Sequence, residues 1–100
     1  MSTLSERLAH GRRTVGLSAR ELSALAGLSS AAVTRLENEN RPRPSASTIA
    51  ALSAVLGCTF AWLLDGTGEE PMAEAMRLSV AEARARRAAQ QPHAATGTEG

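Results

Sequence analysis

The sequence predicts an all-α protein in which five short helices form one small domain, followed by a C-terminal helix and a loose tail. Apolar residues recur three or four positions apart along the chain, and no segment alternates between apolar and polar residues as a half-buried strand does. Hydrophobic residues make up 43% of the 100 residues, which is enough for one core. Because the chain has one Phe, one Trp and no Tyr, that core has to be aliphatic.

The first two predicted helices are separated by a glycine. An apolar stripe over residues 4–15 defines the first helix, which ends at Gly16. Ser18 and Glu21 have the spacing of a capping box, in which the serine oxygen accepts a backbone N–H and the glutamate reaches back to the cap. Behind this box we expect a second helix of about nine residues that ends at Gly27.

The third predicted helix follows a turn of three residues, Gly27-Leu28-Ser29. Ser29 or Ser30 can cap it, and Val33 and Leu36 supply its buried face. It fades before the two prolines of the next loop, since a proline disfavours helix for the residue that precedes it. Two short helices joined by so tight a turn cross steeply, and the second is free to enter a groove.

Two more helices complete the predicted domain, which covers residues 1–66. The fourth begins at Ser45 or Ser47 and ends at Gly57. Its apolar residues are Ile49, Leu52, Val55 and Leu56. The fifth is short, and its apolar residues are Phe60, Leu63 and Leu64.

The composition changes after Gly66. Residues 67–71 have the composition of a hinge, residues 72–90 are rich in the helix formers Ala, Glu and Arg, and residues 92–100 lack large apolar side chains. We therefore expect a C-terminal helix over about 72–90 and a flexible tail. Its apolar stripe consists of Met72, Met76, Val80 and Ala83. The stripe packs either against the same chain or against a second copy, and the sequence leaves both open.

Charge does not by itself indicate a nucleic-acid partner, because the net charge is only +1. All 11 basic residues are arginine, and residues 1–66 hold seven of them against five acids. The predicted domain therefore carries the positive balance. Arginine suits bidentate contacts to phosphate or guanine, although a GC-rich coding sequence gives the same bias.

Several functional classes have no support in the sequence. A single cysteine, Cys58, excludes an intrachain disulfide and a Cys-rich zinc site, and His10 and His93 lack metal-ligand spacing. There is no nucleophile motif or glycine-rich phosphate loop, so we expect neither an enzyme nor a cofactor. The N-terminus has no signal-peptide pattern, and no run approaches the roughly 20 apolar residues of a membrane span. We expect a cytoplasmic protein without a membrane partner.

The ordered motifs resemble the phage-repressor and Cro-type helix-turn-helix family, also called the xenobiotic-response-element family of bacterial regulators. The resemblance covers about residues 4–66. The motifs that carry it are Gly16-Leu17-Ser18, Glu21-Leu22, Gly27-Leu28-Ser29, Arg35-Leu36-Glu37-Asn38 with Arg41 and Pro44, Leu56-Gly57-Cys58, and Trp62-Leu63-Leu64-Asp65-Gly66. It implies a five-helix fold like that of lambda repressor, which binds operator DNA through the third helix, about residues 29–38.

The resemblance also implies roles for particular residues. Those that match base-reading positions are Ser30, Ala31, Thr34 and Arg35. Those assigned to backbone phosphates are Ser18, Ala19, Arg20, Ser29, Asn38, Arg41 and Arg43. Arg12 and Glu37 match a buried ion pair between the first helix and the end of the third. The residues expected to pack a dimer or the C-terminal segment are Phe60, Trp62, Leu63, Met72, Met76 and Val80.

The sequence departs from the family pattern at the expected interface. Ala19 replaces the usual glutamine, so one side-chain contact to phosphate is missing, and Glu39 places a negative charge where the family often has glycine. Ala31 offers only a methyl contact, for instance to thymine. Arg35 is then the one base-reading side chain able to make a bidentate contact to guanine.

These observations predict a transcriptional regulator, most simply a repressor that binds its operator as a homodimer with the third helices about 34 Å apart. We expect bacterial or phage origin, association with the nucleoid when bound, and possible control by a protein such as an antirepressor. Two alternatives remain open. One is an antitoxin whose residues 67–100 wrap a toxin. The other is a protein-interaction adaptor that keeps the fold but no longer reads DNA.

Overall fold

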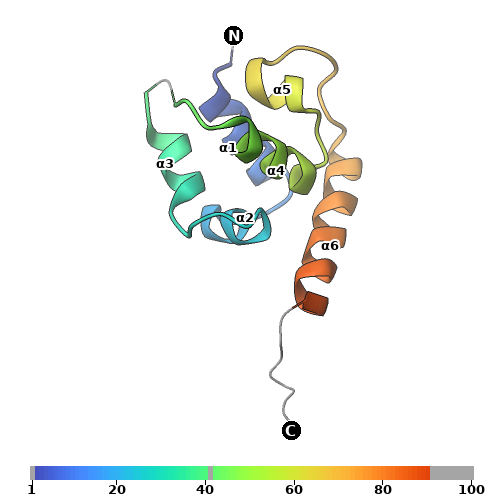
Figure 1. Cartoon of the computed structure of the whole chain (residues 1–100). Coiled ribbons are helices and arrows are strands. Elements are labelled where there is room, and N and C mark those ends of the chain that lie inside the picture. The colour runs from blue at the N-terminus through green and yellow to red at the C-terminus, as the bar shows by residue number, and fades with distance from the viewer. Residues whose placement is uncertain (1, 41, 91–100) are drawn as a thin grey trace, which may run out of the picture.

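The computed structural model describes residues 2–40 and 42–90. Over these residues the chain forms six α-helices and no strand, which confirms the all-α prediction (Figure 1). The helices are α1 (Leu4–Thr14), α2 (Ala19–Leu25), α3 (Ala32–Asn38), α4 (Ala46–Leu56), α5 (Phe60–Asp65) and α6 (Ala73–Gln90). None of these helices is both long enough and apolar enough to cross a membrane. The predicted tail, residues 92–100, lies outside the described residues.

Hydroxyl side chains begin four of the helices, by accepting a hydrogen bond from a backbone N–H of the first turn. These caps are Thr3, Ser18, Ser45 and Thr59. The predicted capping box at Ser18 is only half formed, because Ser18 Oγ accepts from the Glu21 N–H at 3.0 Å while the Glu21 carboxylate binds Arg84 of α6 instead. A complete capping box joins Thr3 and Glu6 at the start of α1.

The prediction that Ser29 or Ser30 caps α3 is wrong. The N-cap residue of α3 is Ala31, and no side chain of its own turn binds its free N–H groups. One of these N–H groups, that of Val33, donates instead to Ser23 Oγ of α2 at 3.0 Å. A cap supplied by another helix makes a local serine unnecessary, and it fixes the start of α3 to α2.

The buried apolar side chains form one cluster that all six helices share. Its members are Leu8, Leu17, Leu22, Val33, Leu36, Ile49, Leu52, Val55, Leu56, Trp62, Leu63, Met76, Val80 and Ala83. Trp62 and Leu63, which the sequence offered as dimer or tail contacts, are 6% and 0% exposed and belong to this core. They therefore have no free surface with which to contact a second chain.

Helix α6 packs against the same chain, which answers the question that the sequence left open. Met76 and Val80 are each 2% exposed, and they lie against the body formed by α1, α2 and α4. Gly11 of α1 allows this close packing, because a Cβ there would lie 3.2 Å from Met76 Cε and 3.3 Å from Leu56 Cδ1. Met72 is 74% exposed, so including it in the stripe was wrong: α6 begins at Ala73, and Met72 belongs to the linker.

A buried arginine that the sequence analysis missed supports the C-terminal end of α5. Arg7 of α1 is 6% exposed, and its guanidinium donates to Leu63 O at 3.2 Å and to Leu64 O at 2.9 Å. Carbonyl groups in the last turn of a helix have no partner within the helix, so these bonds satisfy two of them. The sequence feature that could have indicated this role is the position of Arg7 within the apolar stripe of the first predicted helix.

Candidate nucleic-acid interface

The turn between α2 and α3 has the geometry of a Schellman motif. Gly27 has a φ of +75°, in the left-handed region that favours glycine. Its N–H donates to Ala24 O at 3.1 Å, and the N–H of Leu28 donates to Ser23 O at 2.9 Å. These two bonds close the end of α2 and redirect the chain into α3, as the sequence predicted from Gly27.

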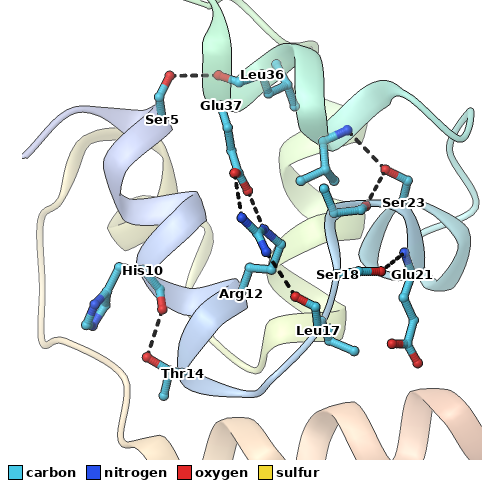
Figure 2. A network of polar contacts seen from close by, with 12 residues as sticks. Ser5, His10, Arg12, Thr14, Leu17, Ser18, Glu21, Ser23, Leu36 and Glu37 are labelled. Carbon is cyan, nitrogen blue, oxygen red and sulfur yellow. Dashed lines mark hydrogen bonds and ion pairs between the residues drawn. The ribbon is translucent and has the colours of Figure 1, made fainter.

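Three polar contacts hold α3 at its start, its side and its end (Figure 2). At the start, Ser23 Oγ accepts from the Val33 N–H and donates to Ala19 O at 2.9 Å. At the end, Ser5 Oγ of α1 donates to Leu36 O at 2.7 Å. Neither serine was recognised in the sequence, where the only signal was a small polar residue on an apolar helix face.

The side of α3 is held by the ion pair between Arg12 and Glu37. The two side chains meet in bidentate geometry, with Nε–Oε2 at 2.7 Å and a second N–O contact at 2.8 Å. A third guanidinium hydrogen donates to Leu17 O at 3.0 Å. The hydrogen bond with Glu37 raises the pKa of Arg12 above its ordinary value, against the opposing effect of burial. The pair ties α3 to α1 and neutralises the Glu37 carboxylate.

The outer face of α3 is open in the single chain. All four positions that the resemblance assigns to base reading are exposed, and they are Ser30, Ala31, Thr34 and Arg35. Val33 and Leu36 point the other way and are buried in the core. Ser30 and Ala31 lie in the turn just before α3, and Thr34 and Arg35 lie on the helix itself. The start of α3 thus presents exposed side chains above an aliphatic bed, which is the arrangement that a helix needs to enter the major groove.

A groove of about 350 Å³ runs between α3 and the start of α4. Ser29, Arg35, Glu39 and Arg43 are among its lining residues. Within the described part of the chain, neither arginine forms an ion pair. The two cations are therefore available to an anionic partner, and Glu39 is the only acid among the lining residues.

The residues assigned to phosphate contacts differ in what they can offer. Ser18 is exposed, although its Oγ already accepts the Glu21 N–H as a cap, and Ala19 packs half-buried against the core. The others that the structure describes are exposed, namely Arg20, Ser29, Asn38 and Arg43. Arg41 lies outside the described residues. The described residues of this set thus lie on α2 and α3, at the N-cap of α2, or in the segments that follow these helices.

Little else in the structure suggests reactive chemistry. Within residues 2–40 and 42–90, no group of three or more His, Cys, Asp and Glu side chains could hold a metal ion. Cys58 is half-buried, and burial raises the pKa of its thiol, which keeps the thiol protonated at neutral pH.

The comparisons with known proteins point to one family. A family model described as helix-turn-helix matches residues 8–63, which is more than half of the chain and includes α2, α3 and α4 in full. No curated protein and no solved structure matches the chain significantly.

Proposed function

The chain belongs to the Cro/C1-type helix-turn-helix family of DNA-binding transcriptional regulators, and from this premise we propose that it is a repressor that reads operator DNA with α3. The exposed face of α3 carries this proposal, because it is presented by a helix that three polar contacts fix to α1 and α2. Arg35 reads guanine, and the Ala31 and Thr34 side chains contact base edges beside it. Repression follows from occluding a promoter.

The proposed contacts to phosphate supply most of the affinity. Arg20, Arg43 and the backbone at the start of α2 lie on the segments that border α3. Each contact to a phosphate releases condensed counterions, so binding weakens steeply as salt rises. With only Arg35 able to make a bidentate contact to a base, discrimination between DNA sequences is weaker than in a regulator with several amide side chains on this helix.

A homodimer completes the proposed function, because duplex half-sites are related by two-fold symmetry. Phe60 and Leu64 lie one turn apart on α5 and are 40% and 43% exposed. They are the large apolar side chains of α5 that remain free for a second copy, since Trp62 and Leu63 are buried. We expect Phe60→Glu to weaken dimerisation in sedimentation measurements and to reduce affinity for a palindromic site but not for a single half-site.

The antitoxin alternative has less support from the structure. It needs residues 67–100 to wrap a partner, whereas the apolar stripe of α6 is buried in the same chain. The adaptor alternative rests on the small side chains Ala19, Ala31 and Ala32 and on Glu39, and a DNA-binding measurement separates it from the proposed function.

The test is a fluorescence-anisotropy titration of the full chain against the DNA upstream of its own gene and against random duplex DNA, at two salt concentrations. Arg35→Ala removes a base contact worth roughly 1–3 kcal/mol, so it weakens specific binding about 5- to 150-fold and leaves random binding nearly unchanged. Arg77→Ala on α6 removes the same charge and serves as the control. Equal losses on both DNAs would rule out Arg35 as a base reader. Undetectable binding at low salt would favour the adaptor.

A further inference from the structure

We propose that α6 braces the helix-turn-helix unit and that Arg84 and Arg87 are positioning residues for DNA recognition. This inference rests on the proposed function, but its first test does not use DNA. Helix α6 begins ten residues beyond the end of the matched region, residues 8–63, and no role follows for it from the family. Its C-terminal half nevertheless contacts α2, the helix that leads into the DNA-reading turn.

Both arginines bind polar atoms of α2. Arg84 Nε lies 2.9 Å from Glu21 Oε2, which is the carboxylate that the sequence assigned to a capping box. Arg87 donates to Ala24 O at 3.1 Å. The same carbonyl accepts the Gly27 N–H at 3.1 Å, so Arg87 binds the oxygen on which the turn between α2 and α3 closes.

A continuous chain of contacts leads from α6 to α3. Ala24 adjoins Ser23, whose hydroxyl accepts the Val33 N–H in the first turn of α3. Figure 1 shows α3 and α6 on opposite sides of the molecule, and α2 contacts both. With seven residues, α2 is too short to be stable alone, so its neighbours set its position. A displacement of α2 therefore displaces the start of α3.

The arginines project from a helix that is itself firmly docked. Met76, Val80 and Ala83 are buried, and Ser79 Oγ donates to Ala54 O of α4 at 2.9 Å. The backbones approach closely at Gly57, where an added Cβ would lie 2.7 Å from Ser79 Cβ. Because α6 cannot shift freely against α4, its contacts to α2 constrain α2 more than a pair between two mobile side chains would.

Amide hydrogen exchange of the full chain without DNA tests the brace directly. In Arg87→Ala we expect the N–H groups of Gly27, Leu28 and Val33 to exchange about two- to fivefold faster, the range given by exposed polar contacts. Exchange at Leu52 in α4 should not change, since the core is untouched. Arg77→Ala is the matched control: Arg77 is an exposed arginine on the same helix and forms no ion pair with a described residue. Equal exchange at the turn in the two variants would overturn the proposal.

DNA binding distinguishes a brace from a direct phosphate contact. We expect Arg84→Ala and Arg87→Ala to weaken binding to the upstream DNA two- to fivefold without changing the slope of log K against log salt, whereas loss of a phosphate contact would reduce that slope by about 1. The exchanged pair Glu21→Arg with Arg84→Glu should recover affinity relative to either single variant. A reduced slope, or no recovery, would overturn the positioning role. If the unaltered protein bound no DNA, the proposed function would be refuted. The amide hydrogen exchange measurement would still test whether α6 holds α2 in place.

Discussion

Replacing Ser23 with alanine tests how α3 is held in place. The Ser23 side chain is fully buried, and its hydroxyl accepts the Val33 N–H at 3.0 Å while donating to Ala19 O at 2.9 Å. Alanine fills nearly the same space but offers no acceptor. The substitution therefore leaves a buried N–H at the start of α3 without a partner, and it changes packing very little.

The expected cost follows from two opposing effects. A buried donor that loses its partner costs about 1–3 kcal/mol. Alanine is a better helix former than serine by roughly 0.5 kcal/mol, and Ser23 lies within α2. We expect Ser23→Ala to lower the free energy of unfolding by about 1–2 kcal/mol. Affinity for DNA should fall as well, because the start of α3 is no longer tied to α2.

Ser53 provides a matched control within the same core. It lies in α4, is 5% exposed, and its Oγ has no hydrogen-bond partner among the described residues. The Ser53 hydroxyl lies beside the Cys58 thiol and lowers its pKa, against the larger effect of burial, but no hydrogen bond of normal geometry joins the two groups. A thiol is also a weak hydrogen-bonding group. Removing a buried hydroxyl that has no partner costs nothing in hydrogen bonding, so Ser53→Ala should be neutral or stabilise by up to about 1 kcal/mol.

Equilibrium unfolding in urea measures both variants. Parallel curves with equal slopes against denaturant allow the midpoints to be compared directly as stability differences. We expect Ser23→Ala to lower the urea midpoint and Ser53→Ala to leave it unchanged or raise it, although the same substitution is made at two buried sites. If Ser23→Ala is as harmless as Ser53→Ala, then the contact between α2 and the first turn of α3 does not hold that helix.

Three further predictions concern packing and titration. Gly11→Val should destabilise the protein by about 1–3 kcal/mol and loosen α6, because even a Cβ at this site meets Met76 Cε at 3.2 Å. We expect a lower melting temperature. An unchanged melting temperature would show that α6 is not closely docked at Gly11. The raised pKa of the Cys58 thiol predicts slow alkylation by iodoacetamide at neutral pH, with a rate that rises at alkaline pH, and a rate like that of a free thiol would contradict burial as its cause. Hydrogen bonds from Thr67 lower the pKa of Asp65, so this contact contributes stability above about pH 4 that is lost as pH falls through the lowered value. Thr67→Val should flatten this acid-side loss in urea midpoints, and an unchanged pH dependence would exclude the contact as its source.

Apolar periodicity and the glycines at helix ends predicted the helices well because both signals are local. Leu52 and Val55 lie on the buried face that their spacing indicates, and Gly57 ends α4 in the left-handed conformation. The ordered motifs from Gly16 to Gly66 placed the family, and at their centre the tight turn between two short helices restricts which residues can be small, apolar or exposed. Signals of this kind act within one or two turns and do not depend on the rest of the chain.

The contacts that position α3 were not predictable in the same way. Glu21 has the spacing of a capping residue, yet its carboxylate binds Arg84, which is 63 residues further along the chain. A capping pattern shows what a side chain can reach locally, and it says nothing about a stronger partner brought close by folding. Similarly, the stripe around Met76 showed that a face is buried but not whether the covering surface belongs to the same chain.

The side chains of α3 make DNA recognition sensitive to how precisely the neighbouring helices position α3. The helix has seven residues, lacks a side-chain cap of its own, and offers DNA mainly small side chains with a single arginine. Small side chains cannot reach further when the backbone is displaced, so a shift of α3 breaks their contacts to DNA. A bidentate contact from Arg35 to guanine also requires a fixed approach. Specific recognition by such a helix therefore depends on the precision of its placement. Ser5, Arg12 and Ser23 supply that placement from α1 and α2, which is why substitutions at these half-buried or buried positions should reduce operator recognition even though none of the three is placed on the exposed face of α3.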